Sequence, residues 1–275
     1  MSRLLRANLL RLIRNRAFWG SLLALAAYQI LCHVSTYRGM IKYDVEVPLD
    51  EIVLNYVIMA GIAQAVFTSL FLGTEYSDGT VRNKIIVGNS RFNVYMAGFI
   101  TCVMAGILMF LATFLVSYLM GLPLFGNLQM KPGYFLALAA GGMFLCVSYA
   151  AMFSLAGSLI SSKAHAAVVC ILVSFALLFA ASYLSNMLSQ PEMIEQVRMA
   201  ADGNMVREIV KNASYVEGMK RQIYQFLLDW IPSGQSIQIS SMEAAHHWRM
   251  LVFSAVNSGL FCVLGYIFFK RKDMK

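Results

Sequence analysis

Apolar residues in this chain gather into long stretches that contain no Asp, Glu, Lys or Arg. Six stretches are long enough to cross a bilayer, because a helix of about 20 apolar residues spans roughly 30 Å of hydrocarbon. They predict transmembrane helices at residues 17–34, 54–72, 94–120, 134–160, 167–184 and 250–269. Backbone polar groups in lipid need partners within their own segment, and the alternation typical of barrel strands is absent. We therefore expect an all-α integral membrane protein with a single transmembrane domain, residues 1–275.

The first 16 residues mix leucines with arginines ahead of the first predicted span. Leucines such as Leu4 and Leu12 lie among the basic residues Arg3, Arg6, Arg11 and Arg14. This pattern predicts an amphipathic interfacial helix over residues 1–16, with its arginines at anionic headgroups of membrane lipid and its leucines in the acyl boundary. A plain positively charged anchor is the alternative. The apolar run of the first span continues past its alanine cluster, so we expect it to be kept and not removed as a signal peptide.

Residues 185–249 form the one sizeable polar stretch and carry helix signals of their own. Pro191 suits a first helical position, apolar residues follow at helical spacing, and Gly203 can end the helix. A second helical pattern begins at Val206. An aromatic, apolar patch over residues 224–231 then precedes a turn at Pro232. These signals predict a small helical extracellular cap between the fifth and sixth spans.

Composition supports a membrane protein and excludes an ordinary soluble domain. The chain has 275 residues, of which 59% are hydrophobic and 13% charged. A typical soluble domain has roughly 45–50% apolar and about 25% charged residues. With the N-terminus taken as inside, the inner segments hold 13 basic and 3 acidic residues, and the outer segments hold 9 basic and 11 acidic ones. Because cytoplasmic flanks hold the excess of Lys and Arg, we expect both termini in the cytoplasm of a plasma-membrane protein, and no nucleic-acid partner.

Motifs for catalysis and cofactor binding are absent from the sequence. It contains no Gly-x-x-x-x-Gly-Lys-Ser/Thr phosphate loop and no His-Glu-x-x-His motif. The five cysteines are scattered in or beside the spans and lack zinc-site spacing. The spans hold neutral polar residues such as Gln64 and Asn257 but no Asp, Glu, Lys or Arg, which disfavours ion coupling. We therefore expect no enzyme activity, no metal and no cofactor bound by this chain itself.

The segment at residues 75–91, between the second and third predicted spans, is the most informative. It reads E-Y-S-D-G-T-V-R-N-K-I-I-V-G-N-S-R. Asp78 or Gly79 can begin a short helix and Gly88 can end it. Such a helix would have an apolar face and a basic face, formed by Val81, Ile85 and Ile86 and by Arg82 and Lys84. A helix along the membrane with an exposed apolar face needs lipid headgroups or a protein partner.

This segment resembles a loop of type-2 ABC exporter permeases, the membrane-spanning subunits of bacterial ATP-binding-cassette exporters. The matching residues are Glu75, Gly79, Thr80, Arg82, Asn83, Lys84, Gly88, Ser90 and Arg91. In that family the short helix is a coupling helix, which docks in a groove of the ATPase subunit. The permease there works as a pair of six-span units. The overall topology is also similar, but only residues 75–91 are specific.

The resemblance implies a permease subunit with two ATPase chains, which would bind ATP and magnesium, and a second permease chain, identical or related. It implies outward transport of an amphiphilic substrate, such as a peptide antibiotic, a lipid-like compound or a drug. A role in antimicrobial peptide resistance is the preferred expectation. Two alternatives stay open: residues 75–91 could be a positively charged topogenic loop, and the chain could be a stand-alone membrane receptor or scaffold with a ligand-binding outer cap.

Overall fold

Long helices dominate the computed structural model, which describes residues 1–199, 205–244 and 246–272. The helices are α1 (Ser2–Ile13), α2 (Arg16–Tyr43), the short 3₁₀ helix η1 (Leu49–Glu51), α3 (Val57–Ser77), α4 (Thr80–Ile86), α5 (Arg91–Phe125), α6 (Pro132–Leu159), α7 (Lys163–Ser189), α8 (Gly218–Trp230), α9 (Pro232–Ser240) and α10 (His247–Arg271). Two strands, β1 (Met193–Met199) and β2 (Met205–Lys211), lie between α7 and α8.

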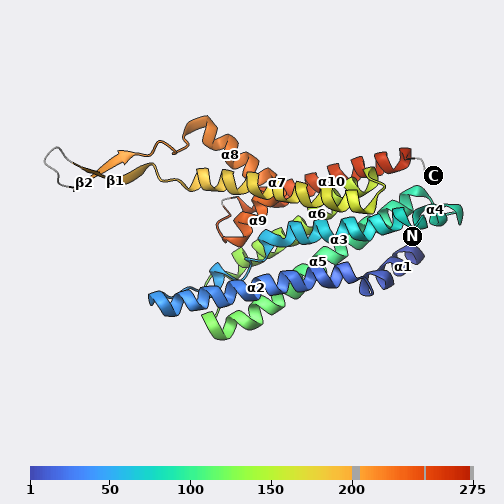
Figure 1. Ribbon diagram of the computed structural model, residues 1–275, viewed down its shortest axis with the longest axis horizontal. Coiled ribbons are helices and arrows are strands. Elements are labelled where there is room, and N and C mark those ends of the chain that lie inside the picture. The colour runs from blue at the N-terminus through green and yellow to red at the C-terminus, as the bar shows by residue number, and fades with distance from the viewer. Residues whose placement is uncertain (200–204, 245, 273–275) are drawn as a thin grey trace.

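Six of these helices are long and apolar enough to cross a membrane, namely α2, α3, α5, α6, α7 and α10. Each of the six expected spans coincides with one of these helices, which supports a mainly helical, multi-pass membrane protein. The spans run alongside one another, with both termini and α4 at one end of the bundle and the two strands at the opposite end (Figure 1). We call these the terminal end and the hairpin end. Most helices extend beyond the predicted cores; α2, for example, continues to Tyr43.

The second half of the link between α2 and α3 is largely buried, although much of it is not α-helical. α3 begins at Val57, three residues after the expected start, and the side chains of Ile52, Val53 and Leu54 before it are almost fully buried. Backbone outside a helix is tolerated at membrane depth only where protein groups satisfy it. Gln29 Nε2 donates to the carbonyl of Ile52 at 2.8 Å, and Ser117 Oγ donates to that of Val53 at 2.7 Å. These bonds explain why Gln29 on α2 and Ser117 on α5 are buried.

His33 is a buried ionisable side chain inside the first span. Its Nδ1 and Nε2 lie 3.0 and 3.1 Å from the carbonyl oxygens of Gln29 and Ser117. Searching the spans for Asp, Glu, Lys and Arg alone misses this residue. It belongs with Gln29 and Ser117 to the polar contacts that join α2, α5 and the buried link.

Residues 185–249 are only partly helical, which corrects the expected helical cap. Residues 193–199 and 205–211 form an antiparallel hairpin in which Met193 pairs with Lys211 and Met199 with Met205. Both stretches contain β-branched residues, and the sequence Asp202-Gly203 between them is typical of hairpin turns. Helical spacing alone was therefore a misleading signal here. Gly203, expected to end a helix, lies outside the described residues.

The remainder of this segment forms α8 and α9, and α9 is almost wholly buried. α9 packs against α3, α6 and α7, so it inserts among the spans. Its polar groups find partners there: Ser233 Oγ lies 3.2 Å from Tyr149 Oη, and Gln235 Nε2 donates to the carbonyl of Asp229 at 2.8 Å. Pro232 begins this helix and so does more than close a turn.

The corner between α8 and α9 requires glycine at position 234. A Cβ added to Gly234 would lie 2.1 Å from the carbonyl oxygen of Leu228, which is backbone and cannot rotate away. We expect Gly234→Ala to lower the melting temperature of the purified protein by several degrees. Gly259 in α10 has open space around its Cα, so Gly259→Ala is the matched control. That control should be neutral or slightly stabilising, because alanine favours a helix by about 1 kcal/mol over glycine. Equal melting temperatures would contradict this role of Gly234.

Candidate functional site

The site at the terminal end is built around the turn from α3 into α4. Gly79 has φ +67° and precedes the first residue of α4, a left-handed conformation that glycine adopts without strain. Thr80 Oγ1 donates to the carbonyl of Glu75 at 2.9 Å, which fixes the start of α4 on the last turns of α3. Gly88, at φ +96°, follows the end of α4, and Ser90 Oγ caps α5 by accepting from the amide of Asn93 at 3.2 Å. The expected short helix between two glycines is therefore present.

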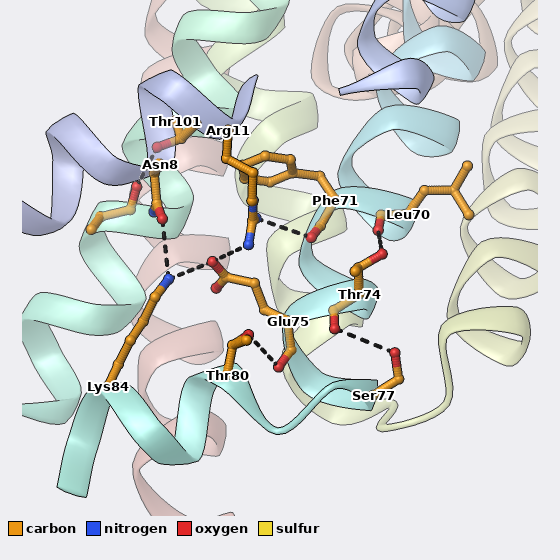
Figure 2. A network of polar contacts seen from close by, with 11 residues as sticks. Asn8, Arg11, Leu70, Phe71, Thr74, Glu75, Ser77, Thr80, Lys84 and Thr101 are labelled. Carbon is orange, nitrogen blue, oxygen red and sulfur yellow. Dashed lines mark hydrogen bonds and ion pairs between the residues drawn. The ribbon is translucent and has the colours of Figure 1, made fainter. Parts of the chain in front are cut away.

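Glu75 is the centre of the site. It is only 3% exposed, and its Oε1 contacts both Arg11 Nη1 and Lys84 Nζ (Figure 2). Burying an isolated carboxylate is very costly, and two cations with charge-assisted hydrogen bonds offset that cost. Lys84 Nζ also donates to Asn8 Oδ1 at 3.1 Å. One carboxylate oxygen thus joins α1, α3 and α4.

Arg11 packs against α3 and is the least exposed of the four arginines expected at lipid headgroups. Its guanidinium carbon lies 3.8 Å from the centre of the Phe71 ring, and its Nη2 donates to the carbonyl of Phe71 at 3.2 Å. A guanidinium can stack on an aromatic ring and donate hydrogen bonds in its plane at once. Arg11 is therefore held by three contacts on α3, whereas Arg3, Arg6 and Arg14 are exposed.

Two leucines of α1, Leu4 and Leu12, contact the protein where the sequence pattern suggested acyl chains. Leu12 is 2% exposed and packs in a cluster with Phe67 and Phe71 of α3. Leu4 is 9% exposed and shares a second cluster with Val81 of α4. The amphipathic helix buries this apolar face against the bundle, because α3 and α5 offer apolar surface there. α1 is therefore an integral part of the site.

Some apolar residues of α4 and its C-terminal turn face the protein interior, and others are exposed. Val81 is 3% exposed and packs inward, with Ile85 partly buried beside it. Ile86 and Val87 are 69% and 81% exposed. Arg82 and Asn83 are exposed one turn earlier, at the spacing that places residues three or four apart on one helix face. We call Arg82, Asn83, Ile86 and Val87 the α4 tip.

Arg91 connects the site to the last span. Its Nη1 donates to the carbonyls of Lys270 and Lys272 at 2.8 and 2.9 Å, at the C-terminal end of α10. Lys272 Nζ in turn donates to the carbonyl of Ser158 at 2.9 Å, near the end of α6. Burial lowers the pKa of Lys272. Cations at helix C-termini satisfy carbonyls that have no partner within the helix.

The structure thus divides the residues singled out from the sequence into four groups. Glu75, Lys84 and Arg11 meet at the buried carboxylate of Glu75, and we call these three residues the buried cluster. Gly79, Thr80, Gly88 and Ser90 shape the turns at the two ends of α4. Arg82 and Asn83 face outward, and Arg91 holds α10. Asn8 and Phe71 were missed, although a lone asparagine among the leucines of an amphipathic helix was a usable signal for Asn8.

No cluster of three or more His, Cys, Asp or Glu side chains suited to a metal ion occurs among the described residues. The chemistry of the site is that of ion pairing and helix positioning. It contains no nucleophile paired with a base. The arrangement can hold α4 rigidly and present the α4 tip to a partner.

We expect removal of the Glu75 carboxylate to destabilise the fold. Glu75→Ala leaves the partly exposed Arg11 and Lys84 without their shared counter-ion, so we expect a loss of about 1.5–3 kcal/mol in the free energy of unfolding. Arg82→Ala, at an exposed position of the same loop, is the control and should change it by less than about 0.5 kcal/mol. Denaturant unfolding in mixed micelles measures both. A similar small effect of the two variants would show that the cluster contributes little to stability.

Comparison with known proteins adds little to this geometry. No family model matches the chain. Over 73 residues the chain is 32% identical to "Uncharacterized protein YhcI" of Bacillus subtilis (strain 168), which corresponds to 26% of this chain and 23% of that protein. The matched region therefore spans about a quarter of the curated relative's length. This similarity assigns neither a family nor an activity.

Proposed function

We propose that this chain is the permease subunit of an ATP-binding-cassette exporter, driven by ATP that separate ATPase subunits hydrolyse. The observation that carries the proposal is the α4 tip: an exposed patch on a seven-residue helix that is fixed by buried charges. Transmission of force needs a rigid contact, and Glu75 provides it by tying α4 to a span. The terminal end then faces the cytoplasm, in agreement with the excess of basic residues there.

The composition of the α4 tip suits a protein partner. Ile86 and Val87 present apolar surface, and Arg82 and Asn83 add a charge and an amide beside it. Interfaces are often built in this way, with an apolar centre and a polar rim. The resemblance of residues 75–91 to the coupling segment of type-2 ABC exporter permeases identifies the proposed partner as an ATPase. Two ATPase chains, carrying ATP and magnesium, and a second permease chain would complete the exporter.

An apolar groove between α2 and α3 supports an amphiphilic substrate. Its volume is about 270 Å³, and it is lined by small and apolar residues that include Gly20, Ala24, Met59 and Ile62. Tyr28 adds a phenol to this lining. Sites of this kind accept apolar ligands and use a few polar groups to orient them. A peptide antibiotic, a lipid-like compound or a drug would fit this chemistry, and antimicrobial peptide resistance is the proposed role.

One observation favours a second candidate function, a membrane receptor or scaffold. The hairpin extends beyond the bundle (Figure 1), and Met205 and Ile209 on it are 77% and 68% exposed. A two-stranded hairpin by itself is marginally stable in water, so a ligand or partner could bind there. The α4 tip would then contact a signalling protein in place of an ATPase.

The exporter proposal predicts that charge on the α4 tip disrupts the complex. Ile86→Asp should reduce co-purification of the ATPase at least about tenfold, because a carboxylate placed in an apolar contact loses its hydration without a partner. Ile209→Asp is the matched control, since the same residue type is 68% exposed there against 69% for Ile86. The measurement is quantitative pull-down from membranes of the native host. Equal recovery of the ATPase with both variants would overturn the role of the α4 tip.

The proposal also predicts separation of ATP hydrolysis from transport. In proteoliposomes that contain the complete complex, Gly79→Pro should abolish substrate efflux while ATP hydrolysis persists, because proline cannot adopt the positive φ of this turn. Arg82→Glu should act in the same direction. Unchanged transport by both variants would exclude a coupling role. A wild-type chain that purifies without any ATPase, and binds its ligand without ATP, would support the receptor.

A further inference from the structure

We infer that α1 senses anionic lipid at the membrane surface and transmits its position to α4 through Glu75. This inference deepens the proposed function, because it names a regulation of the same coupling site. The contacts on which it rests nevertheless lie within this chain and do not involve an ATPase. It concerns only how firmly α4 is held when α1 is, or is not, drawn to a negatively charged bilayer.

The two faces of α1 have different roles. Its buried residues pack on the bundle, whereas the exposed ones fall on one stripe of the helix, given a rotation of about 100° per residue. The exposed stripe consists of Arg3, Arg6, Ala7, Leu10, Ile13 and Arg14. Leu10 and Ile13 are 57% and 62% exposed. Arginines flanking exposed apolar side chains are the composition of a surface that binds anionic membranes.

α1 lies beside the start of the first span, where we expect the lipid headgroups. α1 ends at Ile13, and the first span begins at Arg16, so only two residues separate them. Asn15 caps the span by accepting from the amide of Phe18 at 3.1 Å, and Trp19 Nε1 donates to the carbonyl of Ile13 at 2.7 Å. These bonds keep α1 close to the first turn of α2, where the membrane surface lies.

The positive charge of the exposed stripe indicates which ligand binds there. No acidic residue occurs in the chain before Asp44, so the basic side chains of α1 have no acidic neighbour in sequence. Arg11 alone turns inward, to Glu75. The exposed arginines are therefore available to an anionic surface, and the neighbouring span places a bilayer there. We commit to anionic lipid as the ligand, because the attraction of basic residues to such lipid is long-ranged and additive.

Movement of α1 must affect α4, because the two helices share contacts. Arg11 and Lys84 bind the same oxygen of Glu75, and Lys84 also donates to Asn8 of α1. Leu4 of α1 lies in one apolar cluster with Val81 of α4. If α1 moves away from the bundle, α4 loses an apolar neighbour, and Lys84 loses Asn8, one of its two acceptors. If lipid holds α1 in place, α4 keeps both and stays ordered.

The test measures hydrogen exchange of the full-length chain alone, without an ATPase, in nanodiscs. One set contains phosphatidylcholine only, and the other contains phosphatidylcholine with phosphatidylglycerol. In the anionic discs we expect amides of residues 80–88 to exchange about fivefold more slowly, and high salt to remove the difference. Amides of α10 should exchange alike in both sets, which shows that the fold is intact. Equal exchange of residues 80–88 in the two lipids would overturn the inference.

Variants separate lipid sensing from transmission. Neutralising the stripe with Arg3→Gln, Arg6→Gln and Arg14→Gln should abolish the lipid response. Arg38→Gln with Lys42→Gln is the matched control, since both side chains are exposed at the other end of α2. Glu75→Gln should abolish transmission even though the stripe is intact. Lys84→Gln tests the same step and keeps the pair of Arg11 with Glu75.

The possible outcomes distinguish this inference from the proposed function. A lipid response that persists in Glu75→Gln and in Lys84→Gln would overturn transmission through the cluster. A response lost equally in the Arg38 and Lys42 control would overturn sensing by α1. Because no ATPase is present, failure here leaves co-purification of the ATPase unaffected. If the ATPase did not co-purify with the chain, the lipid response would still be expected.

Discussion

The terminal end of this protein depends on one buried carboxylate. Glu75 is charged and almost inaccessible to water, so it is stable there only while its cations remain in place. Those cations come from segments 64 residues before it and nine residues after it in the sequence. The positions of α1, α3 and α4 are therefore mutually dependent. Arg11 reinforces this by bonding to the backbone of α3 and stacking on Phe71.

A second constraint, the satisfaction of backbone groups at membrane depth, organises the other half of the bundle. The link before α3 leaves carbonyls that no helix satisfies, and Gln29 and Ser117 donate to them. Tyr56, in the link itself, donates in the opposite direction: its Oη bonds to the carbonyl of Phe110 in α5 at 3.0 Å. These polar side chains on apolar helices are thus explained by the irregular backbone beside them. The cost of burying them is offset by hydrogen bonds that the lipid cannot provide.

Local patterns were sufficient to predict the spans but not the contacts between them. A span is recognisable because its apolar composition is continuous, and the glycines around α4 are recognisable because turns require them. The pairing of Arg11 with Glu75 joins distant segments, so no local pattern contained it, and the amphipathic character of α1 was equally compatible with lipid. The hairpin was mistaken for a helix because Met193, Ile194 and Val197 fit helical spacing. Asp202-Gly203 and the β-branched residues were the better signals.

The same contacts define how a displacement of α4 would spread. α4 joins α3 through the turn at Gly79, and Arg91, just beyond α4, holds the end of α10. Both α3 and α10 are long helices, and α6 packs against each of them. At the far end, Tyr149 of α6 contacts Ser233 of α9, and Ser254 of α10 donates to Gln235 of α9. Contacts therefore connect α4 to α9 along two long helices, and because α9 is buried among the spans, a shift of α3 or α10 relative to α9 would break these bonds.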